Sequence, residues 1–132
     1  KLRDELGISL LYITHDLATA YQISDSVIVL YLGNVAEAGD TERVIRQPQH
    51  PYTQLLISSI PVPDPERGWK EDIHLPADDA NVAQVRQGCA FHPRCPHVMP
   101  VCREQKPPLF EVAPRQAAAC FLYRDAPVVT QK

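Results

Sequence analysis

The sequence lacks the features that mark a membrane-spanning, secreted or nucleic-acid-binding protein. No apolar run approaches the roughly 20 residues that span a bilayer, and the opening stretch lacks the order of a secretory signal peptide. The chain carries 13 Lys and Arg against 16 Asp and Glu. This balance disfavours a general nucleic-acid binder, because phosphate neutralisation needs clustered cations. The remaining class is an ordinary globular chain, and its 132 residues are about one domain's worth.

Two residue types are absent from much of the chain. None of the 13 prolines precedes Pro48, and none of the four cysteines precedes Cys89. We therefore expect regular structure over residues 1–47, and turns and extended segments over 61–132 that need another source of order. The chain also does not begin with Met, so we interpret it as a fragment of a longer protein.

The first 60 residues alternate between helix and strand signals. A helix ends before Gly7, and residues 8–14 are almost continuously apolar, as in a strand buried on both faces of a parallel sheet. Asp16 can cap the following helix at 17–24. The remaining predicted elements are a strand at 26–32, a turn at Gly33–Asn34, a strand at 35–38, a helix at 42–47 capped by Asp40 or Thr41, and a helix that starts at Pro51 and ends at residue 60.

Proline-rich sequence then separates this part from a cysteine-rich one. We predict a linker at 61–87, with a short strand near 73–75 as its one candidate element. The expected organisation is an α/β part at 1–60, this linker, and a small irregular extension at 88–132. The extension has few large apolar residues, so a hydrophobic core alone would not fold it and a cross-link such as a bound metal is needed.

The four cysteines have the spacing C-x5-C-x6-C-x17-C, at Cys89, Cys95, Cys102 and Cys120. Two disulfides, a bound metal or four unlinked thiols are the alternatives. Clustering disfavours unlinked thiols. The missing secretory signal favours a metal over disulfides, because thiols inside cells are kept reduced.

The gaps between the cysteines bear on which metal is bound. Structural zinc sites usually pair ligands as C-x2–4-C, whereas gaps of five and six favour a larger object such as an iron–sulfur cluster. Zinc remains an alternative. Metal binding would contribute directly to folding, so a structural role is preferred to redox catalysis. Gly88 and the nearby prolines would fix turns, backbone N–H groups would offset thiolate charge, and the candidate cations are Arg86, Arg94, Arg103 and Arg115.

Three histidines stand at notable positions. His92 and His97 lie among the cysteines and are interpreted as surface or hydrogen-bonding side chains rather than ligands. His15 lies where the predicted strand at 8–14 meets a helix. Ligands of open α/β sheets bind at the carboxyl ends of strands, and a histidine there can hydrogen-bond a phosphate. Taken alone, this pattern is more often structural.

Longer stretches resemble a known family. "GISLLYITHDLATAYQISDSVIVLYLGNVAEAGDTERVI" is similar to the end of an ABC transporter ATP-binding domain. "QPQHPYTQLLISSIP" followed by "GCAFHPRCPHVMPVC" resembles the ATP-binding subunits of oligopeptide and dipeptide importers, including their C-terminal extension. The resemblance covers nearly the whole chain and is weakest over residues 66–87 and after Arg124.

The resemblance implies roles for particular residues. His15 would be the switch histidine, which senses the γ-phosphate of ATP and helps to position the attacking water. The four cysteines would hold a four-iron iron–sulfur cluster. The implied partners are a second ATP-binding subunit, two membrane-spanning permease subunits and, indirectly, an external peptide-binding protein. The implied location is the cytoplasmic face of the cell membrane, with ATP and Mg²⁺ bound only by the full-length parent.

The family's other catalytic parts are absent from this sequence. It contains no G-x-x-x-x-G-K-[ST] phosphate loop, no signature helix and no acidic strand to supply the general base. We therefore expect the parent to be an ATPase and this chain alone to be inactive. The competing functions are a stand-alone zinc module that binds nucleic acid or protein and a secreted domain held by disulfides.

Overall fold

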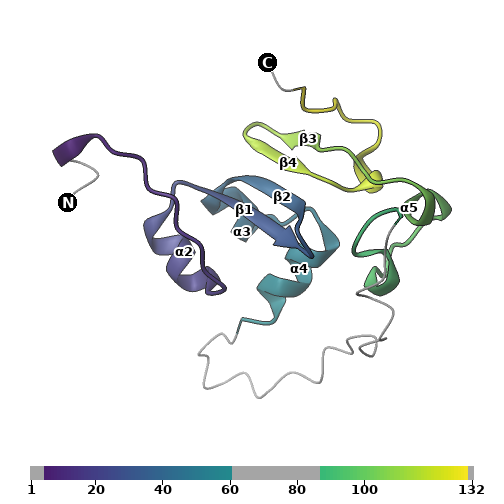
Figure 1. Ribbon diagram of the computed structural model, residues 1–132, viewed down its shortest axis with the longest axis horizontal. Coiled ribbons are helices and arrows are strands. Elements are labelled where there is room, and N and C mark those ends of the chain that lie inside the picture. Colours follow the sequence, from purple (N-terminus) through teal and green to yellow (C-terminus); the bar gives the residue numbers. More distant parts are fainter. Residues whose placement is uncertain (1–4, 61–86, 131–132) are drawn as a thin grey trace.

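The protein is built on one four-stranded antiparallel sheet with short helices around it (Figure 1). The computed structural model describes residues 5–60 and 87–130. The sheet has the strand order β1-β2-β4-β3. The helices and strands are α2 (Leu17–Ile23), β1 (Ser26–Tyr31), β2 (Asn34–Asp40), α3 (Thr41–Arg46), α4 (Pro51–Ser58), α5 (Pro100–Glu104), β3 (Phe110–Ala113) and β4 (Gln116–Ala118).

The predicted hairpin is present, with its turn one residue earlier than expected. Tyr31 pairs with Asn34, so the two turn residues are Leu32 and Gly33, with φ angles of 46° and 74°. Two positive φ values are characteristic of a type I′ hairpin turn. Asn34 instead begins β2, and its side-chain amide donates a hydrogen bond of 2.9 Å to the Leu32 carbonyl. The prediction of a turn at Gly33–Asn34 was therefore wrong by one position.

The tail joins the sheet through β4, which pairs with β2. Gly39 faces Gln116 in this register. A Cβ atom on Gly39 would lie 2.4 Å from the carbonyl oxygen of Arg115, far inside contact distance. Glycine at this position therefore lets two segments separated by more than 70 residues approach closely enough to pair.

The predicted helices that follow Asp16, Asp40 and His50 are present, whereas most of the one before Gly7 lies outside the described residues. Asp16 caps α2, and its carboxylate accepts a hydrogen bond of 2.9 Å from the Ala18 N–H. Asp40 precedes α3 without a side-chain cap bond. Pro51 occupies the first turn of α4, where its missing N–H costs no hydrogen bond.

The predicted strand at 8–14 does not form. These residues have no regular secondary structure, and their apolar side chains are exposed, with Leu11 at 90% and Ile13 at 88%. Figure 1 shows the segment extending away from the sheet. A strand buried on both faces needs paired neighbours and covering layers, and no strand within 5–60 or 87–130 pairs with this one.

The small core lies where β1 and β2 face α3 and α4. Val29, Ala36 and Val44 are buried together, and Tyr52 and Leu56 of α4 pack against them.

No helix in the described ranges is both long and apolar enough to cross a membrane. The candidate strand at 73–75, Arg86 and nearly all of the linker lie outside the described residues.

Candidate functional site

The tail's short elements carry the four cysteines. Cys89 follows Gly88, Cys95 follows a single 3-10 turn, Cys102 lies in α5, and Cys120 follows β4. Cys102 and Cys120 are buried, the other two are half-buried, and all four are free thiols.

The four thiols influence one another electrostatically. Burial is the main cause that raises the pKa of Cys89 and Cys95, and it contributes most to raising the pKa of Cys120 to about 11. The other three thiols raise the pKa of Cys120 further. The fold therefore brings the fourth cysteine, 18 residues beyond the third, into the same neighbourhood as the rest.

Nearby backbone groups oppose the effect of burial on the pKa of three of the cysteines. Each such group lowers the pKa of its cysteine and so favours the thiolate. The groups are those of Phe91 and His92 for Cys89, His97 for Cys95, and Leu122 for Cys120. Burial has the larger effect, so the pKa of all three cysteines is raised and the thiol form is favoured overall.

Gly88 holds two of the cysteine segments together. It has φ +81°, and a Cβ atom there would lie 2.4 Å from the carbonyl oxygen of Cys102. That carbonyl accepts a hydrogen bond of 2.8 Å from the Cys89 N–H. Only a residue without a side chain permits this approach, which confirms the turn role predicted for Gly88.

The described side chains do not form a single-ion site. Within 5–60 and 87–130, no group of three or more His, Cys, Asp or Glu is arranged to hold a metal ion. A tetrahedral zinc with Zn–S bonds of about 2.3 Å keeps its sulfurs roughly 3.8 Å apart. The thiols share one neighbourhood without that compact geometry.

The other predicted participants have separate contacts. His92 donates from Nδ1 to the carbonyl of Cys89 at 2.9 Å, and His97 is exposed. Arg115 lies 3.9 Å from the Asp40 carboxylate. The positive charge of Arg94 lowers the pKa of Tyr52, although burial has the larger effect and raises it.

An aromatic cluster joins the cysteine loop to the first part of the chain. Phe91, 2% exposed, packs edge-on against Tyr31 with ring centroids 5.2 Å apart and lies 5.5 Å from Tyr52. The Tyr31 and Tyr52 rings are 4.6 Å apart. The cluster therefore fixes the loop that carries Cys89 against the end of β1 and the first turn of α4.

A fully buried carboxylate organises the loop before α4. Glu37 accepts hydrogen bonds from the backbone N–H groups of Gln49 (3.0 Å) and His50 (2.9 Å). Gln116 of β4 adds a third from its side-chain amide at 2.8 Å. A buried carboxylate without such donors would be very costly, so Glu37 ties β2, this loop and the tail together.

His50 is the buried N-cap of α4. Its Nδ1 accepts a hydrogen bond of 3.0 Å from the Tyr52 N–H. Burial lowers its pKa to about 4, so the ring is neutral at physiological pH. The sequence analysis missed His50 and Glu37. A histidine directly before the proline that starts a helix was the available signal, because that is an N-cap position.

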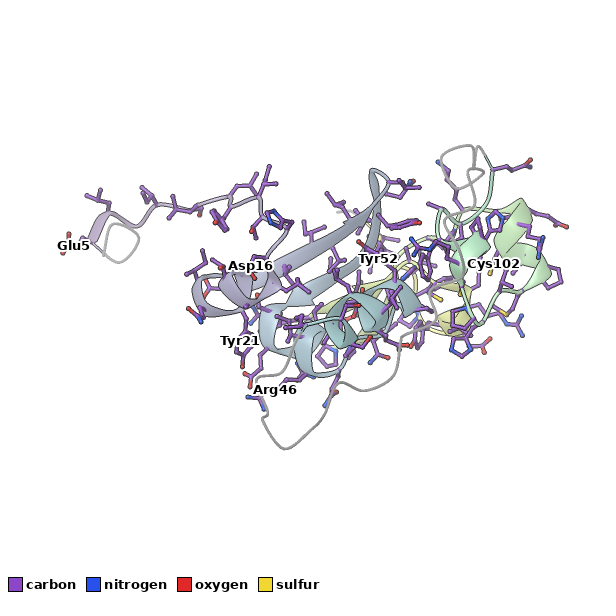
Figure 2. The ribbon with its side chains drawn as sticks, turned by 90° about the horizontal axis from the view of Figure 1, so that it is seen from below. Glu5, Asp16, Tyr21, Arg46, Tyr52 and Cys102 are labelled. Carbon is purple, nitrogen blue, oxygen red and sulfur yellow. The ribbon has the colours of Figure 1, made fainter. Side chains whose placement is uncertain are left out.

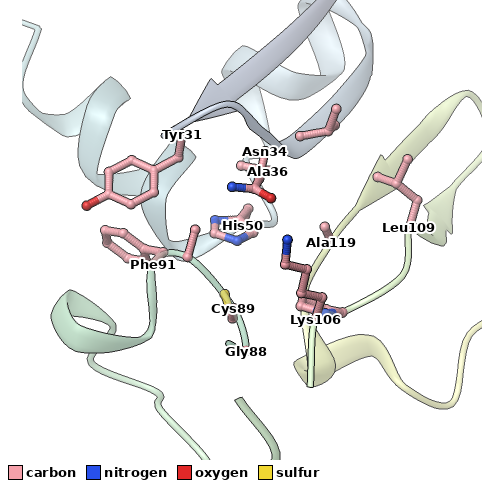
Figure 3. Close-up of a pocket in the computed structure, with 13 residues that line it drawn as sticks. Tyr31, Asn34, Ala36, His50, Gly88, Cys89, Phe91, Lys106, Leu109 and Ala119 are labelled. Carbon is pink, nitrogen blue, oxygen red and sulfur yellow. The ribbon is translucent and has the colours of Figure 1, made fainter. Parts of the chain in front are cut away.

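A cavity of about 230 Å³ lies beside Cys89 (Figure 3). Its walls come from the β1–β2 hairpin, His50, the cysteine loop and the segment before β3. The side chains of Asn34 and Lys106 extend toward it in Figure 3. The cavity shows that the hairpin and the tail meet around His50 without filling the space completely.

His15 stands apart from the thiols. It is exposed and directly precedes the cap of α2. The two views place α2 away from α5, with Asp16 well separated from Cys102 (Figures 1 and 2). The structure thus brings the four cysteines near one another and leaves His15 at a separate location.

Comparisons with known proteins match most of the chain. The family described as "Oligopeptide/dipeptide transporter, C-terminal region" matches residues 36–102. A Bacillus subtilis protein named as an oligopeptide transport ATP-binding protein, YkfD, is 42% identical over 96% of this chain and 39% of its own length. AppF, also an oligopeptide transport ATP-binding protein of that organism, is 41% identical over 93% of this chain and 38% of its own.

A relative from Sinorhizobium fredii extends the comparison to another organism. Named as a peptide ABC transporter ATP-binding protein, y4tS, it is 40% identical over 92% of this chain and 34% of its own length. The chain thus spans less than two fifths of each of these relatives.

Proposed function

Because the chain belongs to the oligopeptide/dipeptide transporter C-terminal-region family, we propose that it is the C-terminal part of the ATP-hydrolysing subunit of a peptide importer. The match over 36–102 carries this proposal, and the names of the relatives point the same way. The partners would be a second ATP-binding subunit and two permease subunits, with a peptide-binding protein acting indirectly. The working location would be the cytoplasmic face of the membrane.

His15 would contribute to hydrolysis in the complete subunit. Its ring is exposed, and Asp16 beside it anchors the start of α2. A histidine held at the start of a helix can hydrogen-bond a γ-phosphate and help to orient the attacking water. The chain contains no phosphate loop, so purified alone it should show no ATP turnover. Turnover by this chain would refute that expectation.

Cys89, Cys95, Cys102 and Cys120 would hold a four-iron iron–sulfur cluster. Support comes from the electrostatic effect of the other three thiols on Cys120 and from the gaps of five and six residues between the first three cysteines. When bound, the cluster would supply covalent links between the cysteine loop, α5 and the strand end at Cys120. The chain's own part is to supply thiolates and to bury them.

One measurement tests this assignment against the zinc module. The 132-residue chain is purified without oxygen and assayed for iron, acid-labile sulfide and zinc. Iron and sulfide in equal amounts, about four of each per chain, are expected. A C120S variant should lose most of both, whereas an H97Q variant, altered at an exposed side chain, should keep them. Stoichiometric zinc without iron would contradict the iron–sulfur cluster and favour the zinc module instead.

A further inference from the structure

The cavity beside Cys89 is large enough to hold a small organic molecule. Its volume is about 230 Å³, and an apolar cavity of about 150 Å³ is known to bind benzene. We call it the hairpin–tail cavity, because its walls come from the β1–β2 hairpin and from the tail, with His50 between them. Cys89 lines it and the other three cysteines, all in the described ranges, do not. The cavity is therefore separate from the space among the thiols.

The inner walls of the hairpin–tail cavity are apolar and buried. Phe91 is 2% exposed, and Ala36 and Ala119 are buried with it. Val35 and Leu109, both half-buried, extend the same lining. Small-molecule sites are typically lined by such side chains, with a few polar groups that fix the orientation of the ligand. These walls favour a ligand with an apolar body.

Two exposed polar side chains lie at the opening of the cavity. Asn34 and Lys106 both line it and both are exposed, in contrast to the buried inner walls. Figure 3 shows the Lys106 ammonium directed toward Asn34 and His50. The Asn34 amide is held in place, because it donates a hydrogen bond of 2.9 Å to the Leu32 carbonyl. A ligand that enters from solvent would therefore meet the ammonium group first.

The charge of the lining has one sign. Among the residues that the structure describes, no Asp or Glu lines the cavity, and none forms an ion pair with Lys106. Burial lowers the pKa of His50 to about 4, so its ring is neutral at physiological pH. Burial also raises the pKa of Cys89, which keeps it a neutral thiol. The Lys106 ammonium thus faces an apolar cavity without a carboxylate to neutralise it.

We propose that the hairpin–tail cavity is a binding site for a small carboxylate with an apolar body, anchored by Lys106 at the opening. One ammonium balances the single charge of a carboxylate, whereas a phosphate monoester carries nearly two charges at neutral pH. The apolar body would lie between the hairpin and the cysteine loop. The inference goes beyond the proposed function and requires no metal at the thiols. A bound ligand would stabilise the attachment of the tail, because both parts contact it.

Four probe molecules separate the two halves of this recognition. Phenylacetate has both the charge and the apolar ring. Phenylacetamide keeps the ring without the charge, phenethylammonium reverses the charge, and acetate keeps the charge without the ring. Each is titrated into the 132-residue chain, prepared without oxygen, and the dissociation constant is measured by NMR of the probe.

Three variants locate the site. K106Q removes the ammonium, and R124Q is its matched control, because Arg124 is an exposed cation that does not line the cavity. A90L adds a larger side chain at a position that lines the cavity. Circular dichroism verifies that each variant is folded, and K106Q decides the outcome alone if A90L is not.

Phenylacetate should bind the wild type with a dissociation constant on the order of 1 mM. Phenylacetamide should bind about tenfold more weakly, since it lacks the charge-assisted bond to Lys106. Acetate should also lose about tenfold, because it buries no ring, and phenethylammonium should not bind. K106Q should weaken phenylacetate about tenfold, A90L should abolish its binding, and R124Q should leave it within about twofold of the wild type.

Other results would overturn the inference. No binding of phenylacetate by the wild type would remove the site. Equal binding of phenylacetate and phenylacetamide, or an equal loss in K106Q and R124Q, would show that Lys106 is not the anchor. Unchanged binding by a folded A90L would place the probe outside the hairpin–tail cavity. None of these results bears on the iron and sulfide content of the chain, so the proposed function stands or falls separately.

Discussion

The segment before α2 and the cysteine-rich tail differ in a way that composition does not anticipate. The segment is rich in large apolar residues, yet Leu11 and Ile13 are almost fully exposed. The tail is poor in them, yet Phe91 and Ala118 are at most 2% exposed. The tail is held by strand pairing, a glycine contact and the hydrogen bonds of Glu37. Apolar residues favour burial only where the chain supplies a partner surface.

The largest loss of stability in the tail should come from Gly88→Ala. The added Cβ meets the carbonyl oxygen of Cys102 at 2.4 Å in a positive-φ conformation, so clash and strain together should cost about 4 kcal/mol of unfolding free energy. Urea titration followed by circular dichroism measures it. Gly33→Ala is the matched control, since φ is +74° with nothing within 4 Å, and should cost only about 1 kcal/mol. Equal costs would show that the contact with Cys102 is unimportant.

The second-largest effect should come from acidification, which should lower the free energy of unfolding. Burial lowers the pKa of His50 in the folded chain to about 4, against 6.5 when it is unfolded. Between pH 6.5 and 4, His50 binds a proton in the unfolded chain but not in the folded chain. The free energy of unfolding therefore falls as the pH drops from 6.5 to 4, and the contribution of His50 to it is complete above pH 6.5. The contribution is at most roughly 3 kcal/mol.

Other carboxylates titrate in the lower part of this window, so the comparison is made between the wild type and H50Q. Urea unfolding of the metal-free chains is measured at intervals from pH 7.5 to 4. The wild type should lose more stability than H50Q over this range. Parallel curves would contradict a buried, neutral His50.

Glu37→Gln should have a smaller effect on the same attachment. The substituted amide keeps the shape but presents an NH2 group in place of one of the two oxygens that accept from Gln49, His50 and Gln116. Leaving such buried donors unpaired should cost about 2 kcal/mol. Glu111→Gln, at an exposed position on β3, is the control and should change the unfolding free energy by less than about 0.5 kcal/mol. A similar change in unfolding free energy for both variants would show that Glu37 does not stabilise the attachment of the tail.

The smallest change in stability is expected in the apolar segment before α2. Leu11→Ser with Ile13→Ser removes apolar side chains that are already exposed, so the unfolding free energy should move by less than about 0.5 kcal/mol. Self-association should fall, because exposed apolar residues in an extended segment invite pairing with another chain. Sedimentation at several concentrations measures this. A wild type that stays monomeric at every concentration would contradict it.

Local signals allowed much of the first part to be predicted. The cap at Asp16, the hairpin and the start of α4 at Pro51 each depend on neighbouring residues, and all are present. The turn lies at Leu32–Gly33 although leucine rarely adopts a positive φ, so the strand register and not the turn propensity fixed its place. The strand at 8–14 was wrong because its expectation assumed sheet neighbours, which no local pattern can guarantee.

By itself, the sequence determined the Asp16 cap, the hairpin and the four-cysteine pattern, since each depends on residues close along the chain. Only the tertiary structure decided that β4 pairs with β2 and that the Cys120 thiol approaches the other three. It also decided that Glu37 and His50 lie buried between the two parts. The pairing of β2 with β4 and the bond between Glu37 and Gln116 join residues more than 70 positions apart, where backbone approach at Gly39 and buried hydrogen bonds select one register among many. No local propensity encodes that choice.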